Sequence, residues 1–175
     1  MEVHNTSTVI KKLLTHDANI GIITGPCELE SISTIPILAD KLILVGGANI
    51  ESESITIEEL FELPLILREE DSTNRILLNN ILAKYMVNME DLNIVLSSNS
   101  PESIKSAVSS GRGFAFLPNI VVKRDLRRGN LKYIKIKDFD SGFNYNLAYR
   151  KDYKFSEHEE IFKKFITSKK RCFCY

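Results

Sequence analysis

Three short polar segments of the sequence have the composition of a site for a small polar or anionic molecule. They are Asn5-Thr6-Ser7, Asp71-Ser72-Thr73-Asn74 and Ser98-Asn99-Ser100. Each precedes an apolar pattern typical of a helix, and the first turn of a helix has backbone N–H groups without intrahelical acceptors. Those N–H groups and the positive end of the helix dipole favour anions, while hydroxyl and amide side chains add hydrogen bonds without charge.

A simpler interpretation is that these side chains only cap their helices, because Ser, Thr, Asn and Asp are common caps in the absence of any ligand. Both interpretations remain open from the residues alone. If a ligand binds, the residues expected to contact it are Asn5, Thr6, Ser7, Ser72, Thr73, Asn74 and Asn99.

Patterns typical of catalysis, metal binding or cofactor binding are missing from the sequence. It contains no Gly-x-Ser-x-Gly, no Walker loop and no Gly-x-Gly-x-x-Gly. The histidines are scattered, and Cys172 and Cys174 are too close together to hold tetrahedral zinc on their own. The basic cluster Lys123–Arg128 lacks interleaved aromatic residues, which favours a solvated turn over a nucleic-acid patch. We therefore expect no enzyme, no cofactor and no metal site.

Strands and helices alternate along the chain and position these segments. Val3 is expected to end a short strand, and apolar runs predict further strands at 20–23, 42–45, 65–67, 94–96, 114–117 and 134–136. Apolar residues at helical spacing predict helices around 9–14, 77–85, 104–108 and 161–166. Two capping boxes are expected, at Thr56–Glu59 and Ser156–Glu159. This alternation predicts an α/β fold with a mostly parallel sheet covered by helices.

The composition is that of an ordinary soluble domain. The chain has 175 residues, 43% of them hydrophobic and 26% charged, with a net charge of zero. A free-standing DNA-binding domain is usually more basic. No apolar run is long enough to span a membrane, and no signal peptide is visible. Three cysteines are too few for a disulfide framework, so a cytoplasmic location without membrane contact is expected.

The order of several motifs resembles the effector-binding domain of bacterial LysR-type transcriptional regulators. A capped helix with Ile104-Lys105-Ser106-Ala107-Val108 ends at Gly111-Arg112-Gly113 and leads into an apolar strand. Leu63–Arg75 is similar to the family's strand and its Arg-Glu-x-Gly-Ser-Gly-Thr-Arg loop. The segments Ala18–Ile23, Tyr145–Lys151 and Phe162–Ile166 are similar to further family elements, so the resemblance covers roughly residues 2–166.

This resemblance implies a two-lobed fold of the type II periplasmic-binding-protein kind, with mostly parallel sheets and two crossing strands. The first lobe would comprise residues 1–63 and 145–175, and the second residues 64–144. The family's first strand and long helix have no match here, and neither do the helix-turn-helix and linker helix. DNA contact would therefore need a helix-turn-helix that this sequence lacks, and the intact regulator would be a homo-oligomer.

The function implied by the resemblance is sensing of a small polar or anionic metabolite in a cleft between the lobes. In the family, hydroxyls at the positions of Thr6 and of the 72–74 loop contact the effector. Asp71 stands where the family has glycine, so it either repels an anionic effector or caps the helix. Arg68 could present its guanidinium to the cleft, although a surface or interlobe ion pair is favoured. The alternative function is a small-molecule binding protein or enzyme of the same two-lobed fold.

Overall fold

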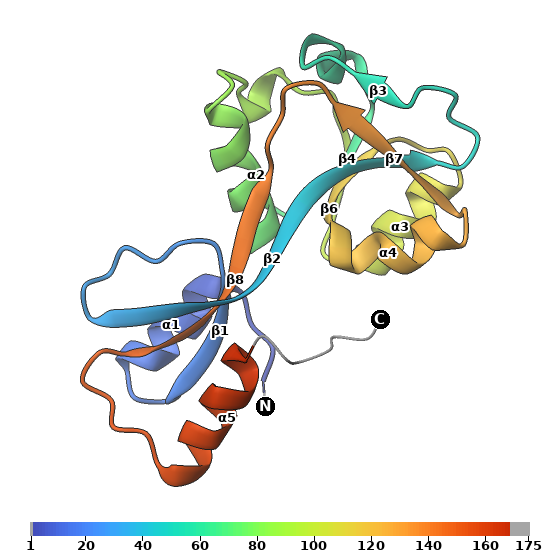
Figure 1. Ribbon diagram of the computed structural model, residues 1–175. Coiled ribbons are helices and arrows are strands. Elements are labelled where there is room, and N and C mark those ends of the chain that lie inside the picture. Colours follow the sequence, from blue (N-terminus) through green and yellow to red (C-terminus); the bar gives the residue numbers. More distant parts are fainter. Residues whose placement is uncertain (1, 169–175) are drawn as a thin grey trace. The chain divides into compact units, whose positions relative to one another are not determined.

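The computed structural model describes residues 2–168, so Cys172 and Cys174 lie outside the described part. The chain forms two compact units, one built from residues up to Ala39 and from Phe143 onward, the other from Asp40–Gly142. The chain enters the second unit within a long strand, β2, and returns within β8 (Figure 1). The second boundary lies close to the expected position, whereas the first lies well before residue 63. As a division into lobes, 1–63 with 145–175 against 64–144 stays a prediction.

The first unit contains a three-stranded arrangement with a helix at each end of its sequence. Its strand order is β1, β8, β2, and β1 runs antiparallel to β8 with Gly21 opposite Ala148. Its elements are α1 (Thr6–Leu14), β1 (Ile20–Thr24), the first part of β2 (Ile32–Gly47), β8 (Gly142–Arg150) and α5 (Glu157–Thr167).

Close packing of α1 on β1 depends on a glycine. A Cβ at Gly21 would come within 2.3 Å of Val9 Cγ1, so a larger residue would push the helix away from the strand. The buried Leu13 side chain continues the same apolar face of α1. The prediction that a short strand ends at Val3 is wrong, because Val3 lies outside any strand and is 89% exposed. It precedes the helix start at Asn5 and has no sheet neighbour to pair with.

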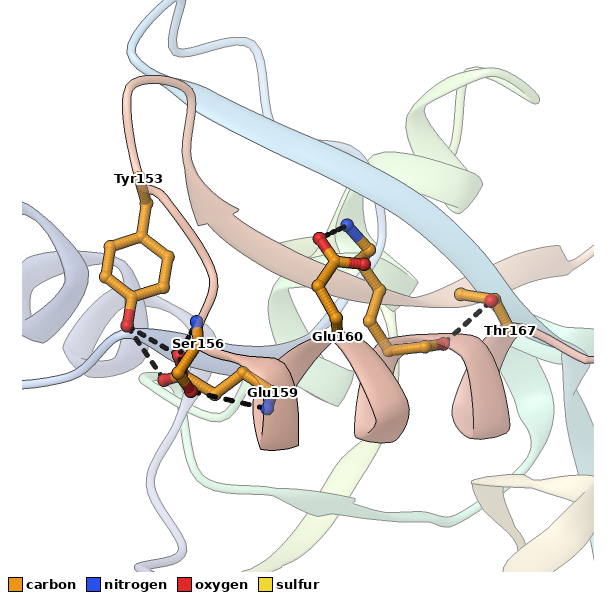
Figure 2. A network of polar contacts seen from close by, with 6 residues as sticks. Tyr153, Ser156, Glu159, Glu160 and Thr167 are labelled. Atoms are coloured by element: carbon orange, nitrogen blue, oxygen red, sulfur yellow. Dashed lines mark hydrogen bonds and ion pairs between the residues drawn. The ribbon is translucent and has the colours of Figure 1, made fainter.

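The start of α5 confirms the second expected capping box (Figure 2). The Ser156 hydroxyl accepts a hydrogen bond from the Glu159 backbone N–H at 3.4 Å, and the Glu159 carboxylate accepts one from the Ser156 N–H at 2.8 Å. The Tyr153 hydroxyl donates to the same carboxylate at 2.8 Å. Within the same helix, the Lys163 ammonium pairs with the Glu160 carboxylate at 2.6 Å.

The second unit is a mixed sheet with helices on both faces. Figure 1 shows α2 on one side of the strands and α3 with α4 on the other. Its elements are the second part of β2, β3 (Ser54–Ile55), the 3-10 helix Glu58–Glu62, β4 (Leu65–Arg68), α2 (Thr73–Ala83), the 3-10 helix Met89–Asp91, β5 (Ile94–Ser98), α3 (Pro101–Ser109), β6 (Ala115–Pro118), α4 (Asn119–Arg127) and β7 (Leu131–Ile136).

The expectation of mostly parallel sheets is wrong in detail. The pairs β4–β5 and β3–β7 are parallel, but β1–β8, β2–β6 and β2–β7 are antiparallel. A strand–helix–strand connection such as β6–α4–β7 joins two strands that run in the same direction, as expected. The sequence pattern does not reveal that β2 lies between them and runs the opposite way.

One face of this sheet holds the core of the second unit under α3 and α4. A Cβ at Gly113, whose φ is +154°, would meet the Pro64 carbonyl oxygen at 2.5 Å, so glycine lets the chain approach β4. Phe114 can then donate its N–H to Pro64 at 2.8 Å. The core residues on this face are Ile43, Val45, Ile66, Ile104, Val108, Ala115, Leu117, Val122 and Leu131.

Two further local expectations have clear outcomes. The capping box at Thr56 is confirmed, because the Thr56 N–H donates to Glu59 at 2.7 Å and the Glu59 N–H donates to the Thr56 hydroxyl at 3.3 Å. The basic turn expected at Lys123–Arg128 is wrong, because most of that segment belongs to α4. Val122 of this helix is fully buried, so packing on the sheet supports the helix despite its charged sequence.

Candidate functional site

The starts of α2 and α3 lie at the same edge of the second unit. They follow the parallel strands β4 and β5, in which Arg68 lies opposite Ser98. The Ser97 hydroxyl donates to the Arg68 carbonyl at 3.3 Å and ties the two strand ends together. The carboxyl ends of parallel strands, followed by helix starts, are where open α/β sheets bind ligands. This edge therefore has the geometry of a ligand site.

The start of α2 is built differently from an ordinary capped helix. Ser72 occupies the N-cap position in an extended conformation and is only 5% exposed, yet its hydroxyl makes no capping hydrogen bond. Thr73 and Asn74, which open the helix, are half-buried. The N–H groups of a first helical turn have no intrahelical acceptors, and here the N-cap side chain does not satisfy them. These donors are well placed for an anion.

Arg75 adds a positive charge to this first turn, and the seven expected site residues do not include it. Its Nη1 atom is buried and has no hydrogen-bond partner among the described residues. Desolvation by burial lowers the pKa of the Arg75 guanidinium, and the nearby Glu70 carboxylate partly opposes that shift. A signal for Arg75 is present in the sequence, since it matches the arginine that ends the family's loop motif.

The structure also places the two other charged residues considered for this loop, Arg68 and Asp71. Arg68 forms an ion pair with its neighbour in the chain, donating from Nε and Nη2 to the Glu69 carboxylate at 2.7 and 2.8 Å. The hydrogen bond from Arg68 lowers the pKa of Glu69. Asp71 is exposed and does not cap α2, because Ser72 holds the N-cap position. Of the two roles considered for Asp71, capping is therefore not the one observed.

At the start of α3 the capping role dominates. The Ser100 hydroxyl accepts from the Ser103 N–H at 3.2 Å, and the Ser98 hydroxyl accepts from the Ser100 N–H at 3.2 Å. Asn99 lies between them and is exposed. Among the described residues its side chain has no hydrogen bond, so its amide is open to a ligand.

The start of α1 belongs to the first unit, and its polar side chains are already engaged. Asn5 Oδ1 accepts from the Thr8 N–H at 3.0 Å and from the Ser7 hydroxyl at 3.0 Å. Thr6 Oγ1 accepts from the Thr24 N–H at 3.1 Å, which links α1 to β1. The structure thus brings Asn5–Ser7 together in one unit and Ser72–Asn74 with Asn99 in the other. That all seven contact one ligand stays a prediction.

Comparison with known proteins identifies the family to which this chain belongs. The profile described as "LysR substrate binding domain" matches residues 1–170. The chain belongs to this LysR substrate-binding domain family. A probable RuBisCO transcriptional regulator of Trieres chinensis is 30% identical over 148 residues, covering 79% of this chain and 48% of that protein. The uncharacterized HTH-type transcriptional regulator YeiE of Escherichia coli K12 is 28% identical, covering 78% of this chain and 46% of that protein. The chain spans about half the length of the curated relatives that it matches.

Solved structures agree with the family at the level of the fold. The regulatory domain of CcmR from Synechocystis PCC6803, in complex with 2-PG, has a TM-score of 0.83 at 20% identity, covering 95% of this chain and 80% of that one. The effector-binding domain of QuiR in complex with shikimate has a TM-score of 0.77 at 21% identity, covering 94% and 77%. The LysR domain described here therefore has the two-lobed periplasmic-binding-protein-like fold. Its described helices include none long and apolar enough to cross a membrane.

Proposed function

We propose that this LysR domain senses a small organic anion, bound at the start of α2 in the second unit. Ser72 and Asn74 would hydrogen-bond the anion, the first-turn N–H groups would add donors, and Arg75 would supply the charge. Thr73 and Asn99, at the same edge, would complete the contacts. Asn5, Thr6 and Ser7 would contact the ligand from the first unit, as the family resemblance implies.

The observation that carries this proposal is that one helix start combines an N-cap residue without a capping bond and an arginine with a buried nitrogen atom that lacks a hydrogen bond. Ser72 is 5% exposed and its side chain makes no capping bond, and Arg75 Nη1 is buried without a hydrogen-bond partner among the described residues. A buried polar atom without a hydrogen bond costs free energy, so such atoms are usually explained by a missing ligand or ion. A carboxylate or phosphate bound at this helix start would give the Arg75 guanidinium an acceptor and could also accept from the Ser72 hydroxyl.

Related domains support the class of ligand. The CcmR regulatory domain was solved with 2-PG and the QuiR effector-binding domain with shikimate, and 2-phosphoglycolate and shikimate are both small anions. These two molecules are therefore suitable first probes, followed by other small organic acids. The identity of the natural effector does not follow from the likeness, since both domains are under 25% identical to this chain.

Calorimetric titration of the purified chain with these acids tests the proposal. Ser72→Ala and Arg75→Gln should each weaken binding, by about fivefold for the lost neutral hydrogen bond and by tenfold or more for the lost charge-assisted contact. Arg128→Gln is the matched control, because Arg128 is exposed at the end of α4. An acid that binds equally well to all four proteins would show that its site lies elsewhere.

We further propose that the chain is one part of a cytoplasmic, homo-oligomeric transcription regulator that turns over no substrate. Its DNA contacts would come from a helix-turn-helix domain outside this sequence, as the name of the Escherichia coli relative suggests. A saturable conversion of a bound acid by the purified chain, lost in Ser72→Ala, would contradict the sensing role and favour an enzyme of the same fold.

A further inference from the structure

A second concavity in the second unit is separate from the proposed effector site. It lies between β2, β7 and α4, has a volume of about 300 Å³ and is lined by Lys41, Ile43, Asn119, Leu126 and Tyr133. None of these residues belongs to the starts of α2 or α3. Its volume is at the lower end of the range typical of small-molecule sites.

The register of the sheet explains why these residues meet. Val45 of β2 lies opposite Tyr133 of β7, and Ile43 is two residues before Val45, so all three side chains share one face. The Asp40 carboxylate accepts hydrogen bonds from the Lys41 N–H at 2.9 Å and from the Ile120 N–H at 3.2 Å. It thereby holds the start of α4 beside the strand that carries Lys41.

The polar groups that line this concavity are unpaired. Within the described part of the chain, the Lys41 ammonium, the Asn119 amide and the Tyr133 hydroxyl have no side-chain hydrogen bond or ion pair. Tyr133 is 47% exposed, which is high for a tyrosine that lies beside a buried core. Ile43 and Leu126 give the concavity an apolar surface. An apolar surface with a few converging polar groups is the usual composition of a ligand site.

The charge around the concavity is positive. Lys41 is the charged lining residue. Lys135 is two residues from Tyr133 on β7 and so faces the same side, and Lys123 lies one helical turn from both Asn119 and Leu126. The nearby Asp40 carboxylate is engaged by two backbone donors. The local field therefore favours an anion over a cation.

We propose that this concavity is a second ligand site, for a small carboxylate with an apolar body. The Lys41 ammonium pairs with the carboxylate, and the Asn119 amide and the Tyr133 hydroxyl donate hydrogen bonds to it. The apolar body lies on Ile43 and Leu126 and against the Tyr133 ring. A site here would let the domain respond to a second metabolite besides its effector.

Nuclear magnetic resonance titration of the purified chain tests this second site residue by residue. Benzoate is the probe, benzamide is its neutral counterpart, and inorganic phosphate is an anion without an apolar body. Benzoate should shift the backbone amides of Ile43, Asn119 and Tyr133 in a saturable way, whereas benzamide and phosphate should bind several-fold more weakly. Lys41→Gln should weaken benzoate binding about three- to fivefold, as expected for an exposed ion pair. Tyr133→Phe should weaken it by a similar factor.

Matched controls separate this site from the proposed effector site. Lys84→Gln removes an exposed lysine at the end of α2, and Tyr149→Phe removes a tyrosine hydroxyl in the first unit; both should leave the titration unchanged. Shifts confined to Ser72–Arg75 would overturn the second site and support the effector site alone. Equal binding of benzoate and benzamide, or of wild type and Lys41→Gln, would overturn it as well. Concentration-dependent broadening of these amides without ligand would instead show that a second copy covers the concavity.

Discussion

The Thr6 hydroxyl accepts a hydrogen bond from the backbone N–H of Thr24 at 3.1 Å. This bond joins the first turn of α1 to the end of β1, within the first unit. A residue expected to contact the effector thus has a structural role of its own. The two roles can coexist, because a hydroxyl that accepts one hydrogen bond can still donate another.

Replacing Thr6 distinguishes these roles. Thr6→Val keeps the shape of the side chain but removes the acceptor for the Thr24 N–H, so the free energy of unfolding should fall by about 1 kcal/mol. Thr6→Ser keeps the hydroxyl and should lose less. Urea unfolding followed by circular dichroism measures both. A Thr6→Val protein as stable as wild type would mean that the bond to Thr24 contributes nothing to stability.

The caps of α2 and α3 form a natural comparison. The Ser100 hydroxyl caps α3 with a hydrogen bond at 3.2 Å. Ser72 holds the N-cap position of α2, but its side chain makes no capping hydrogen bond. Ser100→Ala should therefore lower the free energy of unfolding by about 1 kcal/mol, and Ser72→Ala should change it little. The reverse order should hold for effector affinity, because Ser72 keeps its hydroxyl for the ligand. Equal losses of stability in urea unfolding would show that Ser72 is an ordinary cap.

Much of the local structure could be predicted because it depends on neighbouring residues. The capping box at Ser156 and Glu159 is a relation between residues three apart, and the same holds at Thr56 and Glu59. The α3 helix ends at Ser109, two residues before Gly111, whose φ of +77° few other residues adopt. Each of these features is present in the residues themselves, whatever the rest of the chain does.

The features that sequence reasoning missed depend on distant parts of the chain. The first part of β2 contains Pro36, a residue that argues against a strand interior, and its residues alternate in exposure. Helix α4 has no capping side chain at its start, where Asp40 from β2 accepts the Ile120 N–H instead. The buried Nη1 of Arg75 follows from tertiary burial, which no spacing rule reports. The candidate site was therefore predicted as polar loops but without its charge.

Arg150 is a second charged residue whose role comes from tertiary structure. It is 9% exposed, and its Nη1 donates to the carbonyl oxygens of Leu13 at 2.7 Å and Ala18 at 3.0 Å. These bonds reach one carbonyl in the last turn of α1, where the helix dipole also favours a cation, and one in the loop that follows the helix.

Arg150→Met should therefore lower the free energy of unfolding by about 2–3 kcal/mol, because one buried and one partly buried carbonyl lose a charged donor. Hydrogen exchange should show the loss first at the amides of α1 and β1. Arg112→Met, at an exposed arginine in the turn after α3, is the control. Unchanged exchange in α1 and β1 of the Arg150→Met protein would show that water replaces the guanidinium at little cost.

The capping box of α5 makes part of the stability depend on pH (Figure 2). Hydrogen bonds from the Ser156 backbone, the Ser156 hydroxyl and the Tyr153 hydroxyl lower the pKa of Glu159 from 4.5 to about 2. A carboxyl whose pKa is lower in the folded state stabilises the fold above its unfolded pKa, and this stabilisation is lost as the pH falls through the folded pKa. Glu159 should therefore contribute fully above pH 4.5 and progressively less down to about pH 2.

Comparison with Glu159→Gln isolates this contribution from the other carboxylates, since glutamine has the same shape and does not titrate. The difference in unfolding free energy between the two proteins should be largest near pH 6 and shrink as the pH approaches 3. Thermal unfolding at a series of pH values, together with hydrogen exchange of the α5 amides, measures it. A difference that stays constant over this range would mean that the Glu159 carboxylate has an ordinary pKa in the folded protein, and that its partners hold the neutral and charged forms equally well.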